Sequence, residues 1–347
     1  MPGNVTLSID AMGGDNAPEM VIDGIAAVRK QLTDTRFLLF GDIAQLDYLV
    51  SKAGISDIVT LSHTADYVSN DEKPGVALRN GRNSSMRLAI DAVGDGKAAG
   101  IVSAGNTGAL MAMAKFVLKT LPGIDRPAIA SYFPTIRGEV VMLDLGANLA
   151  CDADNLVQFA VMGEVFARNM LNIKKPTIGI LNVGAEEAKG NQFVREAAIV
   201  LQTANLPIQF HGFVEGHDIG KGTVDVIVTD GFTGNITLKT IEGTAKLFGS
   251  LLKETFSATV RGKLGYLVAK PALEVFKMRM DPRVYNGAMF VGLNGICVKS
   301  HGGTDSLGFA NAIQVAHDLI TNSFNDSIRS DCAQLVKALE EPNELLT

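Results

Sequence analysis

Tryptophan is absent from this 347-residue sequence, and aromatic residues make up only 6% of it. The three cysteines, Cys151, Cys297 and Cys332, lie far apart and form no CxxC pair, so no disulfide framework or zinc site is predicted. This usage is typical of a reduced, cytosolic protein. The first ten residues lack the features of a signal peptide, and no apolar run reaches the roughly 18 residues of a membrane-spanning helix. We therefore expect a soluble protein that at most lies on a membrane surface.

Positive charge is also scarce, since 31 lysines and arginines stand against 37 aspartates and glutamates for a net charge of −6. A nucleic-acid-binding domain would show a basic surface or stripe, so no nucleic acid partner is expected. The sequence is 47% hydrophobic and contains 36 glycines. These proportions indicate a globular core of small aliphatic residues, with glycine in tight loops.

Short apolar runs alternate with segments of helical period along most of the chain. The expected strands are 5–9, 37–40, 58–61, 100–103, 128–133, 140–143, 177–181, 208–212 and 224–229. Because strands that alternate with helices indicate βαβ units, the predicted fold class is α/β, an αβα sandwich around a mainly parallel sheet. We predict one two-lobed domain over residues 1–330, with a helical hairpin insertion at about 235–281, and a polar C-terminal tail at 331–347.

Residues 234–281 depart from this alternation and are predicted to form two long helices with a break near 262–265. Between Leu251 and Met280, six lysines and arginines face two glutamates, so this window carries +4 in an acidic chain. A protruding basic hairpin with exposed apolar positions is typical of a membrane contact or a dimer seam. An ordinary core helix pair is the alternative. The candidate contact residues are Phe256, Leu264, Leu267, Phe276, Lys263, Lys270 and Lys277.

Several loops place glycine directly after an expected strand and before an expected helix. In residues 10–19, Gly13 and Gly14 turn the chain, Asp15 or Asn16 can cap the helix, and backbone amides near the helix start suit an anion. The loop is neither a GxGxxG fingerprint nor a P-loop. A plain capped turn is the alternative.

A second such loop, residues 103–109, contains Asn106 and Thr107, whose side chains can hydrogen-bond phosphate oxygens. Three arginines upstream suit phosphate but could equally form one solvated helix face. They are Arg79, Arg82 and Arg87.

Later loops contain a cation, an amide and an imidazole that suit phosphate or acyl chemistry. Lys189 could stabilise an oxyanion, or could form a weak surface pair with Glu186. Asn235 stands near a helix start, where asparagine is most often a cap. His301 is a candidate acid or base, although a lone histidine is more often structural.

In a parallel sheet these loops would all emerge at one edge, so the sequence predicts a single polar cleft. The chain has no GxSxG elbow and no HExxH helix, and thus no obvious nucleophile of its own. Phosphate is already ionised at neutral pH and could supply the nucleophile. The protein would then hold the phosphate in line and stabilise a tetrahedral oxyanion.

Taken in order, these motifs resemble the acyl-acyl-carrier-protein:phosphate acyltransferase family, known as PlsX, over residues 5–320. The motifs that carry the resemblance are DAMGGD at 10–15, SAGNTGALM at 103–111, EAKGN at 187–191, GFVEG at 212–216, DGFTGN at 230–235 and KSHG at 299–302.

The resemblance implies a fold like that of isocitrate and isopropylmalate dehydrogenases and phosphate acetyltransferase. It implies reversible transfer of a long-chain acyl group from acyl carrier protein to inorganic phosphate, with the acyl phosphate feeding a glycerol-3-phosphate acyltransferase in phospholipid synthesis. It also implies a homodimer, no metal or nucleotide cofactor, and a cytoplasmic protein that associates peripherally with a membrane through the hairpin.

On matching positions, the resemblance implies that Lys189 holds phosphate or the thioester oxyanion and that Asn235 orients the acyl carbonyl. The other residues expected to line this cleft are Asp10, Gly13, Gly14, Asn106, Thr107 and His301. Three alternatives stay open. They are a metal-dependent decarboxylating dehydrogenase, which needs an aspartate trio for Mg²⁺, a short-chain phosphate acetyltransferase, and a non-catalytic membrane scaffold for lipid-synthesis enzymes.

Overall fold

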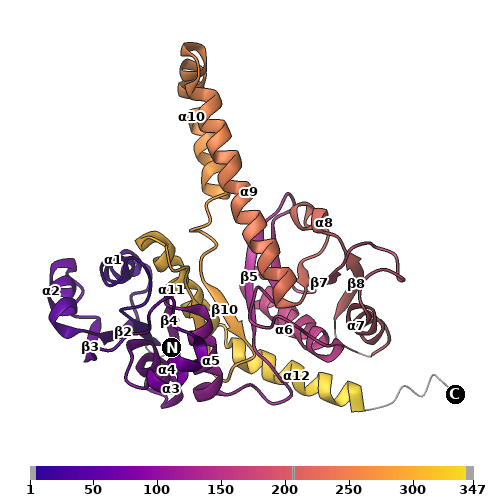
Figure 1. Cartoon of the computed structure of the whole chain (residues 1–347), viewed down its shortest axis with the longest axis horizontal. Helices are drawn as coiled ribbons and strands as arrows, with labels where there is room; N and C mark the ends of the chain where they lie inside the picture. Colours follow the sequence, from indigo (N-terminus) through magenta and orange to yellow (C-terminus); the bar gives the residue numbers. More distant parts are fainter. Residues whose placement is uncertain (1–4, 205, 207, 341–347) are drawn as a thin grey trace.

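The computed structural model describes residues 5–204, 206 and 208–340, and within them a single sheet runs through the molecule (Figure 1). The order of its strands is β3-β2-β1-β4-β11-β10-β5-β6-β9-β7-β8. The strands are β1 Val5–Asp10, β2 Thr35–Gly41, β3 Val59–His63, β4 Gly100–Ser103, β5 Ala128–Pro134, β6 Glu139–Leu143, β7 Thr177–Leu181, β8 Gln209–Val214, β9 Val226–Val228, β10 Ala288–Val291 and β11 Ile296–Lys299.

The sheet consists of two parallel blocks that run in opposite directions. Strands β3, β2, β1, β4 and β11 are mutually parallel, and so are β6, β9, β7 and β8. Between the blocks, β10 is antiparallel to both of its neighbours and β5 is antiparallel to β6. The mainly parallel sheet is therefore confirmed. The expectation that all the glycine loops share one edge is wrong, because the carboxyl ends of the two blocks point to opposite edges.

Helices cover both faces of the sheet, which confirms the αβα sandwich. One buried apolar cluster joins the sheet to α1, α2, α6, α7, α11 and α12, and a second joins it to α3, α4, α5, α8 and the base of α9. The helices are α1 Glu19–Val28, α2 Ile43–Ala53, α3 Pro74–Asn80, α4 Ser85–Gly94, α5 Thr107–Leu118, α6 Ala153–Leu171, α7 Gln192–Thr203, α8 Gly216–Lys221, α9 Gly231–Ser257, α10 Val260–Arg279, α11 Ser306–Thr321 and α12 Phe324–Glu340.

The period of two along β1 decides which side chains reach the functional region. Leu7 and Ile9 are buried in the first cluster. Ser8 and Asp10 point the other way, and the Ser8 hydroxyl donates a 2.7 Å hydrogen bond to the Ala89 carbonyl of α4. The alternation therefore delivers Asp10 to the α4 face at the carboxyl end of the strand.

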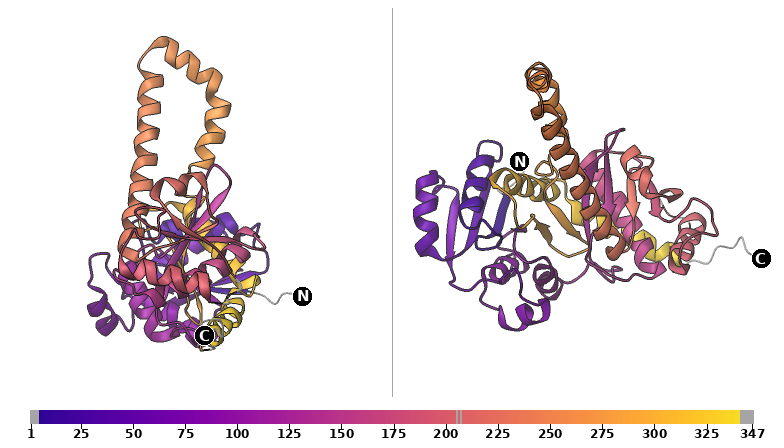
Figure 2. Two further views of the ribbon diagram at one scale, coloured as in Figure 1. Left: turned by 90° about the vertical axis from the view of Figure 1, so that its right-hand side faces the viewer. Right: turned by 45° about the horizontal axis from the view of Figure 1, so that its top comes forward.

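Helices α9 and α10 form a hairpin that protrudes from the three-layered αβα body (Figures 1 and 2). No residue of α10 is buried, which contradicts the alternative of an ordinary core helix pair. The rings of Phe256 and Tyr266 meet edge to face at 5.8 Å and hold the two helices together. A groove of about 1420 Å³ lies between the helices and is lined largely by apolar side chains. Among the described residues, no helix has the length and apolarity that a membrane span requires.

The last helix reaches further than the sequence indicated. Helix α12 extends to Glu340 and packs along α6, so the first ten residues of the predicted polar tail are helical. Residues 341–347 lie outside the described residues.

Candidate active site

The loops that follow β1, β4 and β11 meet at what we call the first edge. Asp10, at the end of β1, is buried and accepts hydrogen bonds from the hydroxyls of Ser85 and Ser103, at 2.6 and 2.7 Å. Burial raises the pKa of the Asp10 carboxyl, while the two hydroxyls and the Lys299 ammonium oppose the rise. Asp10 thus joins β1, β4 and α4, and it faces neighbouring groups rather than open solvent.

The two glycines of this loop are required by close contacts. A Cβ on Gly13 would lie 2.4 Å from an Asp10 carboxylate oxygen and 2.8 Å from the Gly105 amide nitrogen. Gly14 has a φ of +109°, a region that side chains disfavour. These contacts bring the β1 loop directly against the β4 loop.

The expected helix cap is wrong. Helix α1 has Pro18 at its N-cap with no side-chain cap bond. Asp15 instead accepts a 2.6 Å hydrogen bond from Asn70, and the Asn16 amide donates to the Thr304 carbonyl. The two side chains tie neighbouring loops to the β1 loop.

The side chains of Asn106 and Thr107 differ in whether they already form hydrogen bonds within the protein. The Asn106 carbonyl caps α5 by accepting from the Ala109 amide at 3.0 Å, and its NH₂ group donates to the carbonyls of Asn70 and Glu72. All of this holds loops in place. The Thr107 side chain is exposed and has no hydrogen-bond partner within the described part of the chain.

Lys299 is a buried cation that sequence reasoning did not single out as a site residue, although it opens the KSHG motif. Its ammonium donates to the carbonyls of Ala104 and Ser300. Burial lowers the pKa of Lys299 to about 8, against the attraction of Asp10 and Asp15. Side chains two residues apart on a strand point to the same face of the sheet, so the Lys299 side chain lies on the same face as Cys297, which is buried in the second apolar cluster.

His301 follows on the same loop and is exposed. Its Nδ1 accepts a hydrogen bond from the Gly303 amide at 3.2 Å, and its backbone amide donates to Asn286. Desolvation lowers the pKa of His301, and the Lys239 ammonium on α9 adds to this effect. Helix α9 therefore passes beside the first edge even though it starts at the opposite one.

The loops that follow β6, β9 and β7 form the second edge, where Asp144 is the buried anchor. Its two carboxylate oxygens accept from four backbone amides and from the Asn148 side chain, at 2.7–3.1 Å. Burial raises the pKa of Asp144, and these donors oppose the rise. The network fixes the 144–148 loop against which α9 begins.

Helix α9 starts in direct contact with that loop through two glycines. A Cβ on Gly231 would lie 2.6 Å from the Asn148 carbonyl oxygen, and one on Gly234 only 1.8 Å from the Asp144 carbonyl oxygen. The DGFTG sequence thus lets backbone touch backbone.

Asn235 is exposed at this contact, beside Gly146. The cap of α9 is Asp230, which accepts from the Thr233 amide, so the alternative that Asn235 is merely a cap is wrong. Its amide has no hydrogen-bond partner within residues 5–204, 206 and 208–340.

Lys189 lies in the loop after β7, next to β9 in the sheet. Its carbonyl accepts from Asn182, and its backbone amide donates to the Glu186 carbonyl at 2.9 Å. The ammonium is exposed and forms no ion pair with Glu186 or any other carboxylate that the structure describes, so the surface-pair alternative is wrong. Lys189 and Asn235 thus follow adjacent parallel strands, with polar groups that the fold leaves unoccupied.

Cys151 is the thiol nearest to this second edge. Its sulfur donates to the Asn148 carbonyl at 3.7 Å, and burial, aided by Asp144, raises the pKa of Cys151 to about 12. The thiol is therefore protonated at neutral pH and is a poor nucleophile. Among the described residues, no group of three His, Cys, Asp or Glu side chains could hold a metal ion, so the aspartate trio of the dehydrogenase alternative is not found there.

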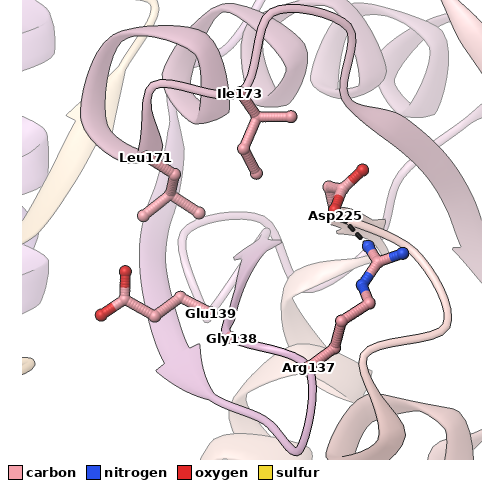
Figure 3. A pocket seen from close by; sticks show the side chains of 6 residues that line it. All are labelled: Arg137, Gly138, Glu139, Leu171, Ile173 and Asp225. Atoms are coloured by element: carbon pink, nitrogen blue, oxygen red, sulfur yellow. Dashed lines mark hydrogen bonds and ion pairs between the residues drawn. The ribbon is translucent and has the colours of Figure 1, made fainter.

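A small pocket of about 230 Å³ lies elsewhere (Figure 3). Arg137 and Asp225 form an ion pair across its wall. Glu139 begins β6 and Asp225 precedes β9, so the pocket lies at the amino ends of strands whose carboxyl ends form the second edge. We do not assign it to the candidate site.

Comparison with known proteins identifies the family. A family model described as fatty acid synthesis protein matches residues 5–327. The phosphate acyltransferase of Rhodospirillum centenum is 62% identical over 96% of this chain and 94% of its own length. The phosphate acyltransferase of Rhodospirillum rubrum is 58% identical, with 96% of each chain covered.

Solved structures support the fold at much lower identity. A phosphotransacetylase from Streptococcus pyogenes superposes with a TM-score of 0.62 at 17% identity, covering 92% of this chain and 94% of its own. A 4-hydroxythreonine-4-phosphate dehydrogenase from Klebsiella pneumoniae gives 0.53 at 14%, covering 92% and 98%. The predicted α/β fold class with its dehydrogenase-like architecture is confirmed.

The fold and the family match together define an acyl-transferring enzyme, which contradicts the non-catalytic scaffold. The chain belongs to the phosphate acyltransferase family, as its motifs indicated.

Proposed function

We propose that the protein transfers a long-chain fatty acyl group reversibly from acyl carrier protein to inorganic phosphate, giving acyl phosphate for phospholipid synthesis. The observation that carries this proposal is the family match over residues 5–327, with relatives named phosphate acyltransferase. The substrates follow from the family resemblance. The protonated Cys151 supports direct attack by phosphate, because no reactive thiol stands ready at the second edge to accept the acyl group first.

In the proposed reaction, a phosphate oxygen attacks the thioester carbonyl carbon and forms a tetrahedral oxyanion. The C–S bond then breaks, and the carrier-protein thiolate leaves and takes up a proton from solvent. Phosphate brings its own negative oxygen, so the mechanism calls for no metal or nucleotide cofactor. The protein contributes orientation and charge stabilisation.

Lys189 and Asn235 are the proposed catalytic residues. The Lys189 ammonium would neutralise phosphate or the oxyanion, and the Asn235 amide would donate to the acyl carbonyl. Their unoccupied polar groups and their adjacent strands, β7 and β9, support this assignment. At the first edge, the Thr107 hydroxyl and the Nε2 atom of His301 are free to reach a ligand, whereas Asp10, Gly13, Gly14 and Asn106 would shape the loops of that edge.

Release of carrier-protein thiol from palmitoyl carrier protein tests the function. We expect the rate to rise with phosphate concentration and to saturate. Lys189→Ala and Asn235→Ala should lower kcat about 100-fold without changing the melting temperature, because both side chains are exposed. A rate independent of phosphate would refute the proposal. Acetyl-CoA used in preference to palmitoyl carrier protein would instead indicate a short-chain enzyme.

We propose that the protein is a cytoplasmic homodimer that reaches a membrane surface through the hairpin, where a glycerol-3-phosphate acyltransferase would take the product. The dimer seam is the alternative role of the hairpin. Its exposed apolar residues include Leu264, Leu267 and Phe276, beside the cations Lys263, Lys270 and Lys277. Phe256 instead packs on Tyr266 inside the hairpin.

Vesicle flotation tests the membrane contact. Replacing Lys263, Lys270 and Lys277 by glutamate should weaken binding to anionic vesicles, since each lysine contributes about 1 kcal/mol near such a surface. Unchanged flotation would remove the membrane assignment. Sedimentation of the Leu267→Glu variant, compared with wild type, tests the dimer seam, which predicts a shift toward monomer.

A further inference from the structure

Helices α3, α4 and α5 present a strongly basic surface on an acidic protein. Between Lys73 and Lys119 the chain has seven lysines and arginines and two aspartates, for +5 in a chain of −6. The two aspartates are neutralised locally, Asp91 by Arg87 at 2.8 Å and Asp95 by Lys97 at 2.9 Å. The positive charge that remains is therefore unopposed within this segment.

The exposed cations that form no ion pair within the described residues all lie on the outer side of one helical layer. Helix α5 packs on both α3 and α4 above the second apolar cluster. We define the basic face as the exposed cations of this layer that form no ion pair with a carboxylate within the residues that the structure describes. They are Lys73, Arg79, Arg82, Lys115 and Lys119.

An exposed aromatic ring lies within this basic face. Phe116 on α5 is 53% exposed, with the Arg87 guanidinium 5.4 Å and the Lys119 ammonium 4.7 Å from its ring centre. Such contacts orient the ring without covering it. A large apolar side chain surrounded by cations is the composition expected of a protein-binding hot spot for an acidic partner.

The basic face starts at the first edge. Helix α4 begins at Ser85, which bonds Asp10, and α5 begins at Thr107, beside the Asn106 cap. Twelve residues of α5 span about 18 Å, so the face extends from the first edge over a distance that a flexible prosthetic arm can bridge.

The position of the basic face also separates it from the other basic surface. In Figures 1 and 2, α3, α4 and α5 lie on the side of the body opposite to the protruding hairpin. A partner bound there would leave α9 and α10 free for a membrane or a second copy. The turn between α9 and α10 lies at the far end of the hairpin from the body (Figure 1), and Lys263 belongs to the first turn of α10 that follows it.

We propose that the basic face is the docking site of the acyl donor, an acidic carrier protein, and that Phe116 is its apolar anchor. This inference rests on the proposed function, because it assumes that the donor is protein-borne. Acidic side chains of the carrier pair with Arg79 and Arg82, while the thioester on its arm passes the first edge toward α9, which lies beside His301. Long-range attraction makes the association fast and sensitive to salt.

Kinetics with two donors tests the docking site. The double variant Arg79→Glu/Arg82→Glu should raise KM for palmitoyl carrier protein about tenfold or more with little change in kcat. Its kcat/KM for palmitoyl pantetheine, the same thioester without the protein, should stay at the wild-type value. Phe116→Ala should likewise raise KM for palmitoyl carrier protein and leave kcat/KM for palmitoyl pantetheine unchanged. Higher salt should raise the wild-type KM and have little effect on the double variant.

The matched control is Lys174→Glu/Lys175→Glu, which reverses two exposed charges on the loop between α6 and β7. It changes the net charge equally and should leave both donors unaffected. The docking proposal is overturned if the control raises KM as much, if the Arg79/Arg82 variant does not raise it, or if Lys263→Glu/Lys270→Glu raises it instead. Failure of wild-type enzyme to release thiol with phosphate refutes the proposed function separately, and binding of carrier protein then still reports on docking.

Discussion

Gly234→Ala should disable the enzyme by separating α9 from the loop on which it starts. The added Cβ would lie 1.8 Å from the Asp144 carbonyl oxygen, whereas ordinary contact begins near 3.4 Å. Both groups belong to backbone, so no side-chain rotation relieves the overlap. Helix and loop must therefore separate by about 1.6 Å, which is the difference between those two distances.

This shift has a structural cost and a larger functional one. Overpacking of this kind typically lowers the free energy of unfolding by about 1–3 kcal/mol, partly offset by the roughly 1 kcal/mol by which alanine exceeds glycine in helix propensity. Asn235 moves with the helix, and a displacement of about 1 Å costs on the order of 100-fold in rate when it misaligns a catalytic group. The phosphate-dependent thiol release assay should show this loss while the protein remains folded.

Gly243→Ala provides the matched control on the same helix, because nothing lies within 4 Å of its added Cβ. It receives the same gain in helix propensity without the overlap, so it should be as active as wild type and equally or more stable. If Gly234→Ala keeps wild-type rate and melting temperature, the close contact between α9 and the Asp144 loop does not position the site.

Two further predictions concern buried groups. Lys299→Met should remove one contribution to the pH dependence of stability. The pKa of Lys299 is about 8 in the folded protein and 10.5 in the unfolded chain, so between these pH values the unfolded chain binds more protons. The free energy of unfolding of the wild type should therefore rise with pH relative to that of the variant. Melting temperatures of both proteins from pH 7 to 10.5 measure this, and parallel curves would contradict it. Cys151→Ser should keep kcat within about twofold in the thiol release assay, because a thiol with a pKa near 12 is not the acyl acceptor; a loss of activity in a folded variant would indicate an acyl-enzyme.

The local chemistry of the loops was predictable from the sequence, whereas their arrangement was not. The glycine-rich loops at 10–15, 103–108 and 230–235 do follow strands, and the glycines at 13, 14, 231 and 234 stand where backbone contacts or a positive φ exclude side chains. Those requirements are local and leave a signature in the sequence. The relation between the loops depends on strand directions, which no single motif encodes.

The reversal of strand direction in the sheet has a signal in the sequence that hydrophobic periodicity does not carry. The expected strands 128–133 and 140–143 are separated by six residues, too few for the crossover that joins parallel neighbours. They form an antiparallel pair, β5 and β6. Strands β10 and β11 were not predicted, since four-residue runs after a long helical segment resemble any buried apolar stretch. These four central strands decide that there are two edges.

The two edges differ in what their polar side chains do, and this difference predicts how substitutions at two asparagines will behave. Asn106 caps α5 and holds the 70–72 loop, so Asn106→Ala should lower the free energy of unfolding by about 1–2 kcal/mol. Asn235 makes no such contacts, so Asn235→Ala should leave stability unchanged and lower kcat. Denaturant unfolding and thiol release, measured on both variants, test the contrast. Equal losses of stability would show that the second edge is as much scaffold as the first, and that chemistry is not what its unoccupied groups serve.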